Sequence, residues 1–133
     1  MLYKFEITAK DKKFMANHNE LGKIGEEIAQ KFLADKGYNI LDINWTWGKA
    51  ELDLVAKVGG ILVFVEVKTR QNIAFGYPEE AVGRKKEKMI YDAAVEYMDR
   101  IGYENEIRFD IISVTMEPKL LVEHFPDAFF PTW

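Results

Sequence analysis

The chain of 133 residues has the length of one globular domain, and its 48% hydrophobic residues suffice for a core. The net charge of −4 argues against binding nucleic acid by bulk positive charge alone, and the absence of cysteine excludes disulfides and thiolate metal sites. The sequence has no signal peptide and no apolar run of about 18 residues, so we expect a cytoplasmic protein without membrane contact.

The N-terminal stretch differs from the rest of the chain. Residues 1–16 are expected to form an extension or arm, and residues 17–133 a single domain. Helix signals begin just after Met15, so the natural start is either Met1 or Met15.

A first helix is predicted from Asn17 to about Lys36. Asn17 with Glu20 three positions later is typical of a helix start, and Gly37 is typical of a helix end. The central apolar stripe of this helix consists of Leu21, Ile24, Ile28 and Phe32.

Two acids of this helix need separate interpretation. Glu26 lies at the edge of the apolar stripe and can face inward, whereas Glu27 lies on the other flank. The alternative is that both are surface glutamates. Gly22 and Gly25 lower helix propensity, which predicts a close approach of the helix backbone to a neighbour or a ligand.

Three strands follow, over residues 38–45, 51–56 and 61–68. The last is apolar on both faces, as in a central strand, and ends in Glu66 and Lys68. Gly59–Gly60 between the second and third strands is a strong hairpin signal.

The hairpin allows the cross-strand pairs to be counted. If Val58 pairs with Ile61, the opposed pairs are Val55 with Phe64, Asp53 with Glu66, and Glu51 with Lys68. A turn at Val58–Gly59 would keep the acids on one face, whereas a three-residue loop would separate them. Two opposed carboxylates repel unless a cation lies between them.

A loop with Arg70 is predicted over residues 69–78, and a second helix from Pro78 to about Ile101. Lys86 falls within the apolar stripe of that helix, four residues before Ile90. Its ammonium therefore either reaches the acids or a phosphate, or extends to the rim with its stem packed.

The C-terminal part is predicted to contain a strand over residues 107–115 and a last strand or packed tail over residues 120–125. Asp110 shares a face with Ile112 and Val114. It is therefore either a partly buried acid or a hydrogen-bond acceptor at the end of the sheet.

The element order α-β-β-β-α-β predicts an α/β fold whose acids meet in one pocket. Glu26, Asp53 and Glu66 with Lys68 suit metal-assisted hydrolysis of a phosphodiester. Asp53 and Glu66 would bind Mg²⁺ or Mn²⁺, with Glu26 completing the shell directly or through water. Lys68 would position or deprotonate the attacking water, or stabilise the transition state. The additional candidates are Glu51, Lys86 and Arg70.

These residues resemble the YraN-like family of uncharacterised bacterial proteins. The similar stretches are Leu21–Glu26, Glu51–Ala56, Val63–Arg70, Phe75–Val82 with Lys86, and Arg108–Asp110. The resemblance implies a restriction-endonuclease-like core, related to Holliday-junction resolvases, with a mixed central β-sheet flanked by helices. It places Asp53, Glu66 and Lys68 in the PD-(D/E)xK pattern, with Leu52 instead of proline, and Glu26 as the helical acid.

Three functions compete at this stage. The first is a Mg²⁺-dependent DNA nuclease acting on branched or otherwise structured DNA. The second is a nucleic-acid-binding protein that keeps the nuclease fold without cleaving, and the third is a scaffold with a charged sheet edge. By analogy with resolvases, a homodimer is compatible with the first.

Overall fold

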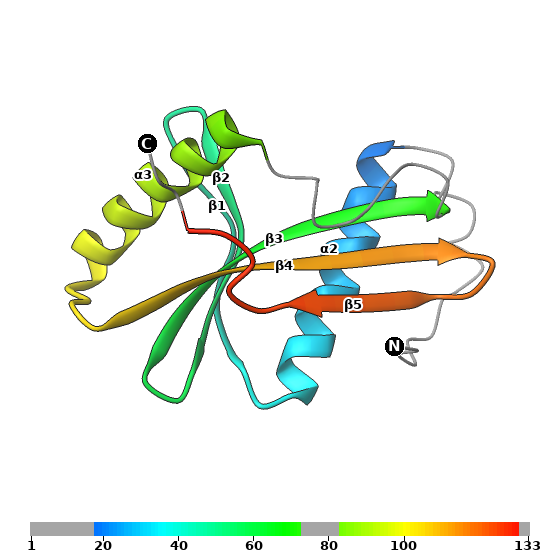
Figure 1. Cartoon of the computed structure of the whole chain (residues 1–133), viewed down its shortest axis with the longest axis horizontal. Helices are drawn as coiled ribbons and strands as arrows, with labels where there is room; N and C mark the ends of the chain where they lie inside the picture. Colours follow the sequence, from blue (N-terminus) through cyan, green and yellow to red (C-terminus); the bar gives the residue numbers. More distant parts are fainter. Residues whose placement is uncertain (1–17, 73–82, 131–133) are drawn as a thin grey trace.

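The computed structural model describes residues 18–72 and 83–130 (Figure 1). The predictions about the arm, Met15 and residues 73–82 lie outside these ranges. The described elements are α2 (His18–Asp35), β1 (Asn39–Trp47), β2 (Ala50–Val58), β3 (Ile61–Asn72), α3 (Arg84–Ile101), β4 (Glu106–Glu117) and β5 (Leu121–Phe125). Neither described helix is both long and apolar enough to cross a bilayer.

The five strands form one mixed sheet in the order β1-β2-β3-β4-β5. β3 and β4 are parallel, and the other neighbouring pairs are antiparallel. A parallel pair needs a crossover connection, and α3 lies in the connection between β3 and β4. The predicted order α-β-β-β-α-β is therefore confirmed, and β5 adds one antiparallel strand beyond it.

A helix covers each face of the sheet (Figure 1). On one face, Ile28 and Leu33 of α2 pack with Val63 and Val65 of β3. On the other face, the α3 residues Ile90, Ala93 and Tyr97 pack with Phe64 and Phe109. β3 is buried on both sides, as its continuous apolar run predicted.

Two predicted boundaries are wrong. Thr69–Asn72 belong to β3 and not to a loop, because β4 continues alongside and Arg70 is paired in register with Thr115. The second helix begins at Arg84 and not near Pro78, because Gly83 is extended, with φ −83° and ψ 164°.

The close approach predicted for the first helix occurs at Gly25 and not at Gly22. A Cβ atom added to Gly25 would lie 1.8 Å from Oγ1 of Thr69, so only glycine fits between α2 and β3. No described atom lies within 4 Å of a Cβ at Gly22. The contact at Gly25 brings the next residue, Glu26, close to the end of β3.

Candidate functional site

The strands β2 and β3 pair from the turn as far as Leu54 and Val65 and then separate at Asp53, which gives a fork in the sheet. The register confirms the pairs Val58–Ile61 and Val55–Phe64, and the ladder ends at Leu54–Val65. The predicted pairs of Asp53 with Glu66 and of Glu51 with Lys68 are therefore wrong. Instead, Oδ2 of Asp53 accepts a hydrogen bond of 2.9 Å from the backbone N–H of Val67. The side chain of Asp53 thus takes the place of a backbone partner.

The burial of β2 shows the same irregularity. Leu52 and Val55 both pack in the α3 core, whereas Leu54 packs in the α2 core. In a regular strand Leu52 and Leu54 would share a face. The alternation therefore slips next to Asp53, which directs its carboxylate into the fork.

Three carboxylates meet at this fork, one from α2 and two from β2. Glu26, Glu51 and Asp53 each offer an oxygen, and these oxygens lie within 4.8 Å of one another. Ligand oxygens on opposite sides of a Mg²⁺ ion lie roughly 4.2 Å apart, so a small tightening would let all three share one cation. Glu51, an additional candidate from the sequence, is thus a full member of this acidic cluster.

Glu66 lies next to the cluster and forms an ion pair with Lys86 of α3. Glu66 is buried, whereas the side chain of Lys86 is 55% exposed. The prediction that the Lys86 ammonium reaches the acids is confirmed. Burial alone would lower the pKa of Lys86, but the hydrogen bond and charge of Glu66 outweigh it and raise that pKa.

The electrostatics of the cluster show an excess of negative charge. Burial, together with the charges of Glu66 and Glu26, raises the pKa of Asp53 to about 8, although the N–H of Val67 acts in the opposite direction. Burial also raises the pKa of Glu26, and the charges of Glu51 and Glu66 add to that rise. A divalent cation is the kind of ligand that would relieve this repulsion.

The two remaining predicted residues lie farther along β3. Lys68 is exposed and forms no ion pair with another residue in the described ranges. Arg70 is buried near the end of the strand. The structure therefore joins Glu26, Glu51, Asp53, Glu66 and Lys86, and it leaves Lys68 outside their contacts.

A cavity of about 310 Å³ opens beside the acids. Its lining residues are Lys49, Ala50, Glu51, Asp53, Glu66, Lys86, Met89 and Ile90. Sequence reasoning missed Lys49, which precedes β2 and belongs to no pattern. The cavity thus combines carboxylates for a cation with two ammonium groups for an anion.

Asn44 of β1 is a second residue that the sequence reasoning missed. Its amide nitrogen lies 3.2 Å from carboxylate oxygens of both Glu26 and Glu51 when the amide is oriented so that donors face acceptors. An asparagine within a strand is unusual, and this was the feature of the sequence that could have identified Asn44 as a functional residue.

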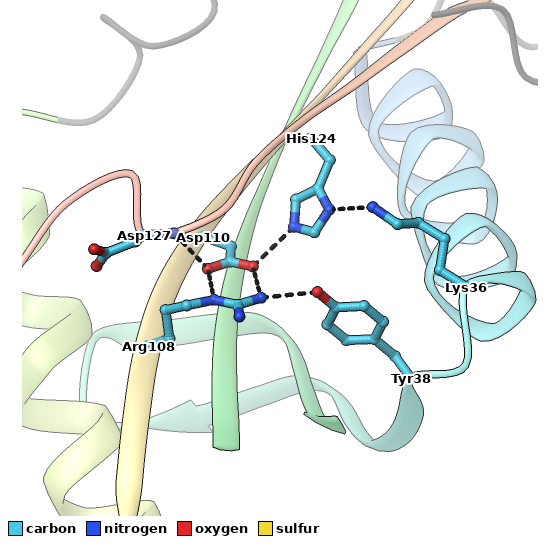
Figure 2. Close-up of polar contacts among 6 residues, drawn as sticks. All are labelled: Lys36, Tyr38, Arg108, Asp110, His124 and Asp127. Atoms are coloured by element: carbon cyan, nitrogen blue, oxygen red, sulfur yellow. Dashed lines mark hydrogen bonds and ion pairs between the residues drawn. The ribbon is translucent and has the colours of Figure 1, made fainter. Parts of the chain in front are cut away.

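A separate polar cluster surrounds Asp110 (Figure 2). The fully buried carboxylate of Asp110 accepts two hydrogen bonds of 2.8 Å from Arg108 and one of 2.9 Å from the N–H of Asp127. Nε2 of His124 lies 2.8 Å from the same carboxylate. Burial alone would raise the pKa of Asp110, but the bonds from Arg108, His124 and Asp127 outweigh it and lower that pKa.

The outer contacts of this cluster connect three parts of the fold. Arg108 donates to the hydroxyl of Tyr38 at 2.8 Å, and Nζ of Lys36 lies 3.0 Å from Nδ1 of His124 (Figure 2). An ammonium can only donate, so Nδ1 accepts and the N–H at Nε2 donates to Asp110. Asp110 was predicted to be either a partly buried acid or a hydrogen-bond acceptor; it is fully buried and also accepts hydrogen bonds.

Comparison with known proteins gives one family. The profile of "Uncharacterised protein family UPF0102" matches residues 25–114, a range that contains Glu26, Glu66 and Asp110. A UPF0102 protein of Flavobacterium psychrophilum is 50% identical over 117 residues, which cover 87% of this chain and 98% of the relative. One of Phocaeicola vulgatus is 46% identical over 118 residues, covering 88% and 98%. One of Dictyoglomus turgidum is 41% identical over 117 residues, covering 85% and 99%.

Proposed function

Because the chain belongs to the uncharacterised protein family UPF0102, the YraN-like bacterial proteins, we propose its function from the site itself. The proposed function is that of a Mg²⁺- or Mn²⁺-dependent nuclease that hydrolyses DNA phosphodiester bonds. The observation that carries this proposal is the cluster of Glu26, Glu51 and Asp53, whose oxygens lie within 4.8 Å of one another. Structured or branched DNA is the substrate class that we propose to test first.

The donor set fits a hard divalent cation. Carboxylate oxygens are the ligands that Mg²⁺ and Mn²⁺ prefer, and Glu26, Glu51 and Asp53 would hold the ion. When bound, such an ion polarises a phosphate oxygen and lowers the pKa of a bound water molecule. The hydrogen bond from Val67 fixes the carboxylate of Asp53 before any ligand arrives.

The cations around the cavity suit an anionic substrate. Lys49 and Lys86 both line the cavity, and the partly exposed ammonium of Lys86 is a mobile point charge that can bind a phosphate. Glu66 would bind the metal as a further ligand once Lys86 turns to the substrate. Lys68, two residues after Glu66 on β3, is proposed to orient the attacking water.

A nucleic-acid-binding protein that does not cleave is the competing function. It is favoured by the two lysines of the cavity and disfavoured by the net charge of −4. The two functions differ in the effect of metal: a nuclease requires the cation for turnover, whereas a non-catalytic binding protein with its lysines would bind DNA in a chelator.

The test is a cleavage assay on duplex, single-stranded, flap and four-way-junction DNA with Mg²⁺, Mn²⁺ or chelator. We expect metal-dependent cleavage that is lost in Glu26→Gln and in Asp53→Asn. Glu27→Gln is the matched control, since Glu27 is the exposed neighbour of Glu26 and the exchange removes the same charge outside the cluster. No cleavage under any condition, or equal loss in the control, would overturn the proposal.

A homodimer is part of the same proposal, because symmetric cleavage of a junction requires two active sites. Sedimentation of the protein alone and with junction DNA tests it, and a monomer in both samples would contradict it.

A further inference from the structure

Asn44 interrupts β1 where β2 leaves the regular ladder. Its neighbours are in register, Ile43 with Leu54 and Trp45 with Leu52, so Asn44 lies across from Asp53. The φ angle of Asn44 is +48°, in the left-handed region that residues other than glycine seldom adopt. Asparagine tolerates this region better than most residues, but it is disfavoured within strands.

This backbone conformation directs the Asn44 side chain toward the acids. The amide nitrogen lies 3.2 Å from both oxygens of Glu26 and 3.2 Å from Oε1 of Glu51. One amide group therefore bridges a carboxylate from α2 and a carboxylate from β2. An amide has two N–H donors, so it can serve both acids at once.

The bridge opposes the repulsion between two groups of like charge. The hydrogen bond from Asn44 acts against the burial and the neighbouring charges that raise the pKa of Glu26. A carboxylate that gives one lone pair to an amide still has others for a cation. The contact thus holds Glu26 and Glu51 together without using up their capacity as ligands.

We propose that Asn44 is a positioning residue of the metal centre, which holds Glu26 and Glu51 in place for the cation. The inference rests on the proposed metal site and deepens it. A residue in a sparsely populated backbone region persists where the surroundings enforce it, and such residues gather at functional sites. Hydrogen-bond partners that orient metal ligands typically contribute 10- to 100-fold in metal affinity.

Asn44→Gly is the most informative variant. Glycine adopts a positive φ without strain, which offsets the loss of the amide bridge, so the metal-free protein should melt close to wild type. We expect the Mn²⁺ dissociation constant, measured by isothermal titration calorimetry, to rise by about 10- to 100-fold. In the cleavage assay the Mn²⁺ concentration for half-maximal rate should rise in parallel, and saturating Mn²⁺ should restore most of the rate.

Two further variants sharpen the result. Asn39→Gly is the matched control, since Asn39 is also exposed and also in β1, but pairs with Lys57 away from the acids, so its Mn²⁺ affinity should stay at the wild-type value. Asn44→Ala removes the amide without relieving the backbone. It should therefore bind Mn²⁺ as weakly as the glycine variant but melt at a lower temperature.

The outcomes separate this inference from the proposed function. If wild type binds Mn²⁺ and Asn44→Gly binds it equally well, Asn44 is not a positioning residue, while the metal centre stands. If wild type itself binds no Mn²⁺, the metal centre is wrong and the role of Asn44 fails with it.

Discussion

Two aspartates of one sheet, Asp53 and Asp110, have opposite environments. Asp110 is fully buried and receives hydrogen bonds from Arg108, His124 and the backbone of Asp127. Asp53 accepts a hydrogen bond from the backbone N–H of Val67 and lies beside the carboxylates of Glu26 and Glu51. The pKa of Asp110 is lowered and that of Asp53 is raised to about 8.

The difference separates a group that stabilises the fold from a group that the fold only tolerates. Arg108 neutralises Asp110 without any ligand, and His124 donates a further hydrogen bond to the same carboxylate. These contacts connect β4 with β5 and, through Arg108, with Tyr38. Asp53 accepts a hydrogen bond from a backbone N–H and not from a cation, so its charge is neutralised by a bound proton or a bound cation. Carboxylates that repel one another lower the stability of a fold, and proteins typically retain such groups where they serve a function.

The largest expected effect is on stability at Asp110. Asp110→Asn keeps the shape but leaves Arg108 without its anion and weakens the acceptor of the His124 hydrogen bond, and breaking a buried ion pair destabilises a protein by about 3–5 kcal/mol. Chemical denaturation should show this loss with and without Mg²⁺. A variant as stable as wild type would mean that this cluster does not stabilise the fold.

At Asp53 the same exchange should affect activity and not folding. Asp53→Asn removes a proposed metal ligand and should reduce cleavage by about 100-fold or more. Because repulsion is relieved, its melting temperature in chelator should equal or exceed that of wild type. Added Mg²⁺ should raise the melting temperature of wild type by binding the folded state, with little effect on the variant. A variant that melts far below wild type in chelator, with no effect of Mg²⁺ on either protein, would show a structural salt bridge instead.

Changing the pH should distinguish the two aspartates within one protein. Folded Asp53 holds its proton more tightly than the unfolded chain does, so its contribution to stability is full below its ordinary pKa of 3.8 and is lost as pH rises through about 8. The lowered pKa of Asp110 has the opposite sign: its contribution is present above pH 3.8 and is lost as pH falls.

Melting curves in chelator over pH 4 to 8 test this difference at Asp53. We expect the pH dependence in this window to be flatter in Asp53→Asn than in wild type. Equal slopes in the two proteins would show that Asp53 titrates alike in the folded and unfolded states.

Local patterns predicted the parts of the site that local geometry determines. The turn at Gly59–Gly60 set the register as far as Val55–Phe64, and helical periodicity placed Glu26 inward and Lys86 near the acids. Both depend on contacts within one element or one hairpin, whose spacing is read directly from sequence.

The remaining features depend on competition between distant groups. At the fork, the carboxylate of Asp53 accepts the hydrogen bond of the Val67 N–H in place of a backbone carbonyl. The alternation of apolar and polar residues in a sequence does not indicate where a side chain will replace a backbone partner. The bridge at Asn44 and the bonds of His124 to Asp110 join elements far apart in the chain. Such contacts follow only from the folded arrangement.

The smallest expected effect on stability is at Lys86. Its ion pair with Glu66 is half exposed, so Glu66 is neutralised less completely than Asp110 and more completely than Asp53. Lys86→Gln leaves the buried Glu66 without its cation, and since the lysine is 55% exposed, the loss of stability should be below about 1 kcal/mol. The pocket becomes more negative, so Mn²⁺ should bind several-fold more tightly by titration calorimetry. Cleavage should nevertheless require more DNA for half-maximal rate, because a phosphate contact is lost.

Lys85→Gln, which removes an equal charge from the neighbouring exposed residue, should change neither the Mn²⁺ affinity nor the DNA concentration for half-maximal rate. Weaker Mn²⁺ binding in Lys86→Gln would show that Lys86 supports the acidic cluster instead of competing with the metal for Glu66.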